Sequence, residues 1–362
     1  PVQLVGVLLE ALQKRGLDPA RVDDVILGCS TQVGDQGANI AKAALGFAGW
    51  PEHVPAQTVN RLCISGLEAV ALAAAKVSAG HADLVLAGGV ELMSRVPMMA
   101  DKGAWFADPE VATKTRFVHM GVSADIIATL DGRTREELDA VAVRSHARAA
   151  KAWSEPPPSV IPVGAFVADD GVKPVTADKL AAFPPAFADF LGPAVALAYP
   201  DIAVKHLHSV ATSPQQADGA SLVIVASLEA GKALGLTPRA RVASYVALAS
   251  EPVIMLTGPG PATKKALERA GRKASDVAVF EHNESFAATQ LRFERDIGVG
   301  DTVSADCINP NGGALALGHP LGATGGMLVG SVIDELLKRD ARTGVVAMCA
   351  GAGLAAAMVL ER

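Results

Sequence analysis

Two stretches of this 362-residue chain repeat one order of turn, helix and strand, about 250 residues apart. Residues 63–91 and 319–353 each begin at a reactive side chain, pass through a small-residue turn and an apolar helix, and end on an apolar strand that runs into glycines. Residues 17–29 and 271–283 match as a loop, an Asp and an apolar strand that ends in polar residues. Because both pairs have nearly the same separation, they predict a duplicated fold whose two copies place reactive groups at equivalent helix and strand ends.

The composition favours layers of helices and sheets. Half of the residues are apolar, only 4% are aromatic and 35 are Gly, so Ala, Val and Leu must fill the interior. Such a core suits an α/β architecture better than an aromatic-rich β-sandwich. The length suits two or three domains, or a duplicated unit.

The chain between the two halves has a different character, with Pro-rich stretches such as WSEPPPSVIP and few strand patterns. Thr134 and Glu137 have the spacing of a capping box at the start of a helix. An insertion of this kind predicts a lid over the mouth of a site. The expected domains are an N-terminal half (1–94, completed by about 217–243), an inserted loop domain (95–216) and a C-terminal half (244–362).

Charge and cysteine content exclude several classes of protein. The net charge is −6 and there is no Lys/Arg run, which argues against nucleic-acid binding. No cysteine belongs to a CxxC pair, so we expect reduced intracellular thiols and neither a disulfide framework nor a metal site. The apolar runs are too short to cross a bilayer, so a soluble, cytoplasmic protein without a transmembrane segment is expected. The chain opens on Pro1 within a helical pattern, and we expect an earlier segment, with any targeting peptide, to be missing.

Cys63 lies in TVNRLCISGLEAV, directly before a small-residue turn and an Ala-rich helix. A sulfur near a helix N-terminus is stabilised as the thiolate, the nucleophilic form of cysteine. The segment alone fits a small core cysteine beside Leu62 and Ile64 equally well. Cys63 is therefore a candidate nucleophile whose role depends on what the fold brings beside it.

His319 and Cys349 occupy the corresponding places in the second half. His319 stands in a glycine-rich stretch and precedes Pro320, which suits the first turn of a helix. Dense glycines let the backbone approach a ligand closely, although a buried structural histidine fits as well. Cys349 closes the apolar strand TGVVAMC before Gly351, a position that fits packing as well as catalysis.

The segment EHNESFAATQ (281–290) places hydrogen-bonding side chains at the end of an apolar strand. Buried polar groups of this kind need partners. Asn283 can hold a water or donate to an oxyanion. Glu284 could equally be a carboxylate at a helix start with only a structural role.

Four segments, in this order, resemble the motif regions of the thiolase family: NRLCISG, HNESFA, NGGALALGHPLGATG and the terminal CAGAG. The likeness covers nearly the whole chain, since GDQGANIAKAAL, LAGGVELMSRVPM and PVIMLTGPGPATKKALERAG also resemble thiolase segments. The resemblance implies an α/β thiolase fold, with duplicated βαβαβαββ halves in a five-layer αβαβα arrangement and an inserted loop domain. It also implies an acyltransferase.

The resemblance implies a role for each catalytic candidate. Cys63 would attack the keto carbon of a 3-ketoacyl-CoA and keep the shortened acyl group as a thioester. His319 would activate Cys63 and, with a water held by Asn283, bind the thioester oxygen. Cys349 would protonate the departing acetyl-CoA carbanion, and the backbone N–H groups of Cys63 and Gly351 would form a second oxyanion site.

Coenzyme A and acyl-CoA are the expected substrates, with no permanently bound cofactor. By the resemblance, His119, Met120 and Ser244 contact the pantetheine arm, although each also suits an ordinary loop or core position. The chain departs from the family pattern in its CAGAG motif, in ATSPQQADGA (211–220) and at Ser285, where relatives often have Ala. The last two departures lie near the acyl chain, so an unusual chain-length preference is expected.

The resemblance favours a degradative 3-ketoacyl-CoA thiolase of fatty-acid β-oxidation, similar to the β-subunits of fatty-acid oxidation complexes. The same residues also suit the condensation of two acetyl-CoA molecules. A third alternative is a thiolase-like acyl-CoA or lipid-binding protein without turnover. A decarboxylating ketosynthase fits less well, because Cys349 stands where those enzymes use His or Asn. The expected partners are a second copy of the chain, as a homodimer or tetramer, and a hydratase/dehydrogenase α-subunit.

Overall fold

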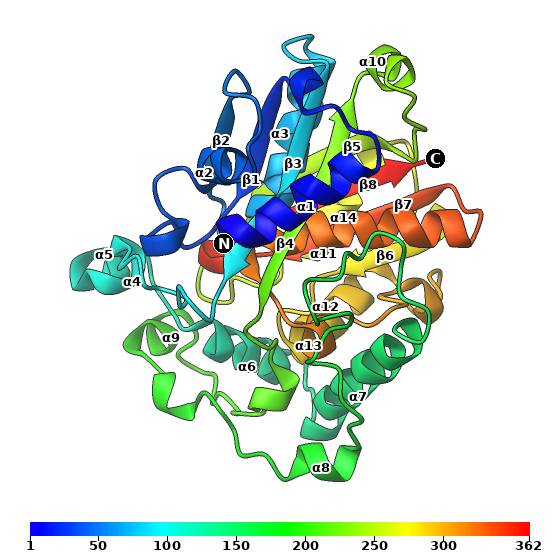
Figure 1. Cartoon of the computed structure of the whole chain (residues 1–362). Helices are drawn as coiled ribbons and strands as arrows, with labels where there is room; N and C mark the ends of the chain where they lie inside the picture. Colours follow the sequence, from blue (N-terminus) through cyan, green and yellow to red (C-terminus); the bar gives the residue numbers. More distant parts are fainter.

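The computed structural model describes residues 1–362 and contains two four-stranded sheets (Figure 1). The first sheet has the strand order β2 (Ala56–Val59), β1 (Asp24–Gly28), β3 (Leu84–Leu92), β4 (Asp218–Ala226). The second has the order β5 (Arg241–Ala249), β8 (Leu354–Glu361), β7 (Thr343–Cys349), β6 (Val279–His282). In each sheet a parallel pair, β1 with β3 or β6 with β7, is followed by an antiparallel strand, β4 or β8. This shared topology confirms the predicted duplication.

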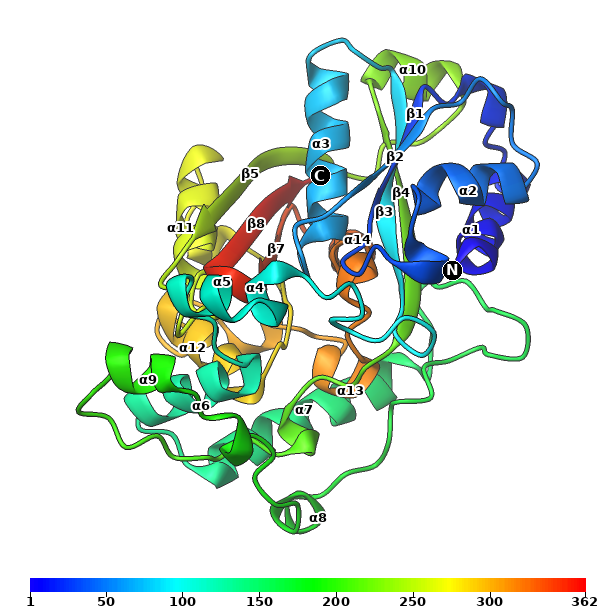
Figure 2. The same cartoon turned by 90° about the vertical axis from the view of Figure 1, so that its left-hand side faces the viewer.

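Helices on both sides of each sheet complete a five-layer αβαβα arrangement (Figure 2). The outer helices are α1 (Val2–Lys14) and α2 (Ile40–Phe47) on the first sheet, and α11 (Pro259–Arg269) and α12 (Ala287–Ile297) beside the second. The helices α3 (Ser65–Ser78) and α14 (Leu321–Lys338) lie between the sheets. The strands β1 and β7 are buried along their whole length, as their apolar sequences predict.

The two central helices touch backbone to backbone, because glycines face each other where the helices meet. A Cβ atom on Gly66 would lie 2.5 Å from the carbonyl oxygen of Gly322. Any larger side chain would push the helices apart. Gly66 follows Cys63 by three residues, and Gly322 follows His319 by three. The contact therefore brings the two helix starts, and the residues that precede them, close together.

The segment between β3 and β4 forms a helical region below the sheets in Figure 1. Its helices are α4 (Ala104–Ala107), α5 (Pro109–Lys114), α6 (Met120–Leu130), α7 (Arg135–Ala152), α8 (Ala177–Ala181) and α9 (Pro193–Ala198). Thr134 and Glu137 form the predicted capping box at the start of α7. The helices α6 and α7 contact α12, and α7 also contacts α13 (Ala314–Leu317). The short helix α10 (Leu228–Ala233) follows β4. The domain boundaries stay a prediction.

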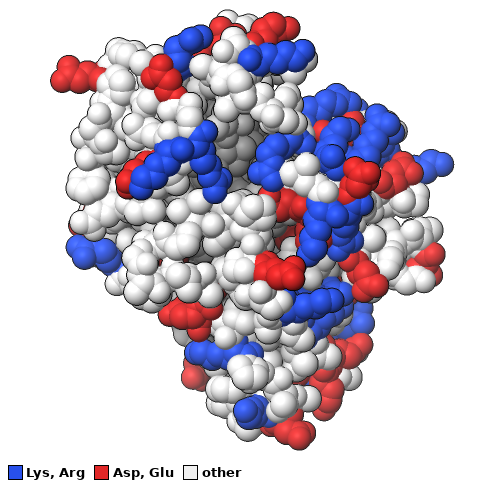
Figure 3. All heavy atoms as spheres, turned by 45° about the vertical axis from the view of Figure 1, so that its right-hand side comes forward, with Lys and Arg blue, Asp and Glu red and all other residues white.

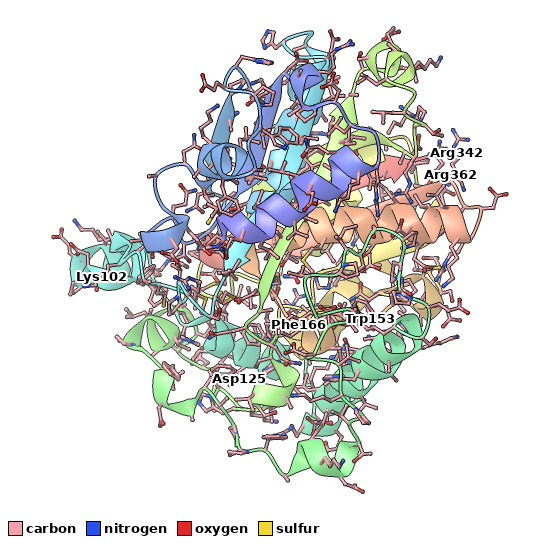
Figure 4. All side chains as sticks on the ribbon, viewed as in Figure 1. Lys102, Asp125, Trp153, Phe166, Arg342 and Arg362 are labelled. Carbon is pink, nitrogen blue, oxygen red and sulfur yellow. The ribbon has the colours of Figure 1, made fainter.

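A buried aspartate ties this helical region to the second half of the molecule. Asp125 of α6, labelled in Figure 4, accepts hydrogen bonds from the backbone N–H of His208 at 2.9 Å and from its Nδ1 at 2.8 Å. The other ring nitrogen of His208 accepts the N–H of Ala288, at the start of α12, at 3.2 Å. The chain of contacts fixes α12 and the loop before it against the inserted segment.

No helix combines the length and apolar character needed to span a membrane. The surface of the protein carries charges of both signs. On the face in Figure 3, Lys and Arg gather beside Asp and Glu. Near the end of α14, Arg339 pairs with Glu335 at 2.8 Å, and Arg362 pairs with Asp340 at 3.3 Å. Ion pairs at the surface contribute about 1 kcal/mol or less each to stability.

Candidate active site

Cys63 lies in a tight turn directly before α3. Leu62 has a φ of 51°, in the left-handed region, which costs a residue with a side chain about 1 kcal/mol. The hydroxyl of Ser65 holds this turn, since it accepts the N–H of Arg61 at 2.8 Å and donates to the carbonyl of Leu62 at 2.6 Å. The turn thereby fixes the Cys63 thiol, and the residue is only 7% exposed.

The thiol of Cys63 faces the end of β7. Burial and, after it, the nearby Cys349 raise the pKa of this thiol, whereas the backbone N–H groups of Gly351 and of Cys63 itself act to lower it. Cys349 is the last residue of β7 and is buried. The structure therefore brings together three of the residues singled out from the sequence, from opposite halves of the chain.

Burial sets the protonation of the site at rest. It raises the pKa of Cys63 to about 12 and that of Cys349 to about 11, and it lowers the pKa of His319 to about 4. The expectation that the helix start favours the thiolate of Cys63 is wrong for the resting protein, because loss of water outweighs the backbone donors. The site therefore holds two neutral thiols and a neutral imidazole, and a nucleophile must form by proton transfer.

The imidazole of His319 is fixed in one tautomer. The hydroxyl of Thr324 donates to the carbonyl of Pro320 at 3.2 Å, so its oxygen accepts the Nδ1–H of His319 at 2.7 Å. The Nε2 atom then carries no proton, and the Nδ2 atom of Asn283 lies 3.3 Å from it. His319 thus presents its basic nitrogen to the site.

The loop after β6 supplies an amide and a hydroxyl. Asn283 places Nδ2 at 3.3 Å from both His319 Nε2 and Ser285 Oγ, while its buried Oδ1 has no partner within the protein. The Oγ atom of Ser285 lies 2.9 Å from the sulfur of Cys349. Asn283 therefore joins the histidine to the loop that contacts the second thiol.

Glu284 points away from these groups and has a structural role. Its carboxylate accepts the hydroxyl of Ser145 at 2.6 Å and the N–H of Leu315 at 3.2 Å. Leu315 belongs to α13, which directly precedes the turn that carries His319. These contacts favour the structural role that the sequence left open for Glu284.

Glu91 is a positioning residue that sequence reasoning missed. It lies near the end of β3, fully buried, and accepts the backbone N–H groups of Ser30 at 2.7 Å and of Gly322 at 3.0 Å. Gly322 is in the first turn of α14, so the carboxylate of one half anchors the helix that follows His319 in the other. A charged residue within the apolar run LAGGVEL was the available signal.

The residues assigned to coenzyme A by resemblance have three different surroundings. His119 caps α6, where its Nδ1 accepts a backbone N–H, and its ring stacks on Phe190 with centroids 4.4 Å apart. Met120 packs against the apolar cluster that contains Cys349. Ser244 of β5 donates at 2.7 Å to a carbonyl of α11, on the outer side of the second sheet. The roles of all three residues stay predictions.

The CAGAG motif adopts a tight turn despite its alanines. Ala350 is extended, with a φ of −145°, a conformation open to any residue. Ala352 has a φ of 59°, in the left-handed region, at a cost of about 1 kcal/mol. A Cβ atom on Gly351 would lie 2.9 Å from the ring of Trp105, so the close packing requires glycine there. Of the two alanines that replace glycines in this motif, Ala350 therefore fits without strain, whereas the backbone of Ala352 is strained.

All four cysteines are free thiols. Cys29 is buried, with its sulfur 3.8 Å from a carboxylate oxygen of Glu91, and burial raises the pKa of its thiol. Cys307 is half-buried in a short turn before α13. Neither takes part in the contacts between Cys63 and Cys349.

Glu281 of β6 is a buried carboxyl outside this network of contacts. Its Oε1 atom has no partner, and burial, with Glu284 and Glu335 nearby, raises its pKa well above 4.5. The folded protein keeps this proton, whereas the unfolded chain releases it near pH 4.5. The stability that the proton provides is therefore complete below that pH and is lost as the pH rises.

The Glu281→Gln variant is therefore expected to melt at a higher temperature than the parent protein, by a few degrees at about pH 8.5 and by less at about pH 6. Calorimetry at the two pH values measures the difference. Glu268→Gln, at an exposed position, is the matched control and should leave the melting temperature unchanged at both pH values. An equal shift at both pH values would contradict the assignment of a buried proton to Glu281.

Comparison with known proteins relates this site to a family. The family models Thiolase, N-terminal domain and Thiolase, C-terminal domain match residues 4–202 and 236–362. The 3-ketoacyl-CoA thiolase of Bacillus subtilis (strain 168) is 37% identical over 376 residues, covering 97% of this chain and 90% of its own length. The 3-oxoadipyl-CoA/3-oxo-5,6-dehydrosuberyl-CoA thiolase of Escherichia coli (strain K12) is 38% identical over 368 residues, covering 96% and 89%.

The fold agrees with these matches. The crystal structure of the Bacillus anthracis acetyl-CoA acetyltransferase superposes with a TM-score of 0.85 at 32% identity, and covers 100% of this chain and 92% of that one. The two family models separate the half that carries Cys63 from the half that carries His319 and Cys349. With both halves matched and their reactive groups meeting at one point, the chain belongs to the thiolase family of acyltransferases.

Proposed function

We propose that this protein cleaves 3-ketoacyl-CoA with coenzyme A in fatty-acid β-oxidation, giving acetyl-CoA and an acyl-CoA shortened by an acetyl unit. One observation carries the proposal: two protonated thiols and an imidazole with a bare Nε2 meet where α3 and α14 begin and β7 ends. Thiolysis needs one thiol to hold the acyl group and a second acid to protonate the leaving carbon. Cys63 and Cys349 fill these two roles.

In the first half of the reaction, Nε2 of His319 takes the proton of Cys63, and the sulfur attacks the keto carbon of the substrate. The N–H groups of Cys63 and Gly351 stabilise the oxyanion that forms. The bond to the acetyl unit then breaks, and Cys349 donates its proton to the carbon that leaves. His319 and a water on the free Oδ1 of Asn283 stabilise the thioester oxygen of the departing acetyl-CoA.

In the second half, the thiol of an incoming coenzyme A returns a proton to Cys349. The resulting CoA thiolate attacks the acyl group on Cys63. The bond between Cys63 and the acyl carbon breaks, and the Cys63 sulfur recovers its proton from His319. Every proton is thereby restored, and the free enzyme returns to two neutral thiols and a neutral imidazole.

The same steps in reverse condense two acetyl-CoA molecules, and the acetyl-CoA acetyltransferase among the similar structures favours this second candidate. The direction of the reaction in the cell depends on the supply of substrate, because cleavage and condensation use the same residues. We place the protein in the cytoplasm, where its thiols stay reduced, as a homo-oligomer with a hydratase/dehydrogenase α-subunit as a candidate partner.

A panel of substrates tests the proposal. The protein is mixed with coenzyme A and acetoacetyl-CoA, longer 3-ketoacyl-CoAs or 3-oxoadipyl-CoA, and the loss of the ketoacyl absorbance is followed. The proposal expects the highest kcat/KM with a longer 3-ketoacyl-CoA, whereas a strong preference for acetoacetyl-CoA supports the condensing enzyme. Binding of acyl-CoA without thiolysis of any substrate would leave a binding protein and overturn both. The Cys63→Ser variant, which forms no acyl-enzyme, is the control for background reaction.

A further inference from the structure

Ser285 is a buried hydroxyl to which the steps above give no role. It is 7% exposed, and its Oγ atom lies 2.9 Å from the sulfur of Cys349 and 3.3 Å from Nδ2 of Asn283. Its own N–H donates to the carbonyl of Asn283 at 2.7 Å, and the N–H of Asn283 donates to Ala347 of β7 at 3.0 Å. The tight turn after β6 is thus tied to the strand that ends at Cys349, which fixes the hydroxyl beside the thiol.

The hydrogen bonds around Ser285 have a defined direction. The Nδ2 atom of Asn283 can only donate, so Oγ of Ser285 accepts from it. The serine proton is then free for the sulfur of Cys349, because the competing carbonyl of Asn283 is more distant, at 3.4 Å. A Cys349 thiolate accepts this proton, and a Cys349 thiol can donate its own to the serine oxygen. The hydroxyl therefore serves both protonation states, which an Ala side chain cannot do.

In the resting protein the other surroundings of Cys349 do little to stabilise a negative charge. Cys349 packs in a cluster of apolar side chains from α6, α12 and residues 253–256. Cys63, at the start of α3, and His319, before α14, are the ionisable groups that share the site, and both are neutral at rest. During turnover His319 carries the proton of Cys63 when the Cys349 thiolate forms, so the resting protein is the state in which the contribution of Ser285 can be measured alone. Burial and Cys349 raise the pKa of Cys63 most, and Glu91, which lies against the start of α14, adds to the rise. Burial raises the pKa of Cys349, and the bond from Ser285 opposes that rise.

We propose that Ser285 is a positioning residue for the proton that Cys349 carries, and that it stabilises the thiolate left after this proton is delivered. The proposal rests on the proposed function. As the new C–H bond forms on the acetyl unit, the S–H bond of Cys349 breaks and its electron pair stays on sulfur, where the hydroxyl of Ser285 donates. The thiol of coenzyme A then returns a proton to the sulfur.

A thiol titration tests the proposal without any need for turnover. In a Cys63→Ser background, iodoacetamide modifies Cys349, and mass spectrometry of its peptide gives the rate as a function of pH. Adding Ser285→Ala is expected to slow modification about tenfold at a given pH and to move the curve up by about one pH unit. Ser285→Thr, which keeps the hydroxyl, should restore the parent curve. A curve unchanged by Ser285→Ala, or one that Ser285→Thr fails to restore, overturns the proposal.

A kinetic measurement separates this role from a structural one. With Cys63 present, Ser285→Ala should lower kcat for thiolysis about tenfold and leave KM unchanged. Transfer of an acetyl group from acetyl-CoA to Cys63 should keep most of its rate, because the CoA thiolate that leaves is a weak base and, unlike a carbanion, departs without needing the proton of Cys349. Equal losses in both steps would overturn the proposal. Ser123→Ala removes another buried hydroxyl, which donates to Val253, and should change neither measurement.

The failure of the proposed function gives a different result. If the protein carries out no thiolysis, the unsubstituted chain itself shows no turnover. The rate of Cys349 modification can still be compared between the Cys63→Ser protein and the same protein with Ser285→Ala added. That comparison still reports whether Ser285 stabilises the thiolate. The two proposals therefore fail independently.

Discussion

Replacing Cys349 by Ala is expected to stop cleavage of the carbon–carbon bond while Cys63 still accepts an acetyl group from acetyl-CoA. Cys349 is the protonated thiol that faces Cys63, with a pKa raised to about 11 by burial. Loss of such an acid slows its step by about 10²–10⁴-fold. Acyl transfer from acetyl-CoA forms no carbanion, and the CoA thiolate that leaves is a weak base that departs without the proton of Cys349, so this step proceeds with Cys63 and His319. Thiolysis is measured by ketoacyl absorbance, and the acetyl-enzyme by mass spectrometry.

The matched control for this prediction is Cys307→Ala. It removes a thiol of the same kind from a half-buried turn outside the site and should leave both activities intact. If Cys349→Ala slows acetyl transfer as much as thiolysis, Cys349 supports the structure of the site and is not its acid. Normal cleavage by the variant would assign the proton to another group.

The fold could be predicted from local pattern and its duplication. Strands such as β1 and β7 are continuous apolar runs, and both prove to be buried throughout. The capping box at Thr134 and Glu137 marks the start of α7, because its two hydrogen bonds lie within four consecutive residues. Features of this kind depend on neighbours in the sequence, so the sequence alone reveals them.

The assembly of the site could not be read in the same way. Cys63 and His319 approach each other because Gly66 and Gly322 let two helices touch, and those glycines are some 250 residues apart. Glu91 contributes through bonds to two distant backbone N–H groups, which no local motif announces. Resemblance to a family supplied the catalytic candidates, whereas contacts between the halves supply their geometry.

Protonation states were the least accessible property. A helix start near Cys63 predicts a thiolate, yet the closed interface between the halves excludes water and reverses the preference. The tautomer of His319 likewise depends on the hydroxyl of Thr324 and on its bond to the carbonyl of Pro320. The protonation state of Cys63 and the tautomer of His319 therefore depend on contacts that form only when the two halves pack together.

His319→Ala is expected to slow the acylation of Cys63 about 10³-fold or more near neutral pH, since the variant loses both a general base and an oxyanion contact. The pH dependence gives a sharper test. In the unsubstituted protein, His319 has a pKa of about 4, so its base form is complete above about pH 5.5 and acylation falls only as the pH drops toward 4.

Without His319, acylation must draw on the thiolate that Cys63 forms by itself. Since burial raises the pKa of Cys63 to about 12, its thiolate fraction increases about tenfold with each pH unit below that value. The acylation rate of the variant should therefore climb steadily with pH, whereas the parent rate is level, and stopped-flow acylation by acetyl-CoA measures both. His81→Ala, at an exposed position, should keep the level profile. A level profile for His319→Ala would mean that another base deprotonates Cys63, because an unassisted buried thiol has no other way to show a constant rate.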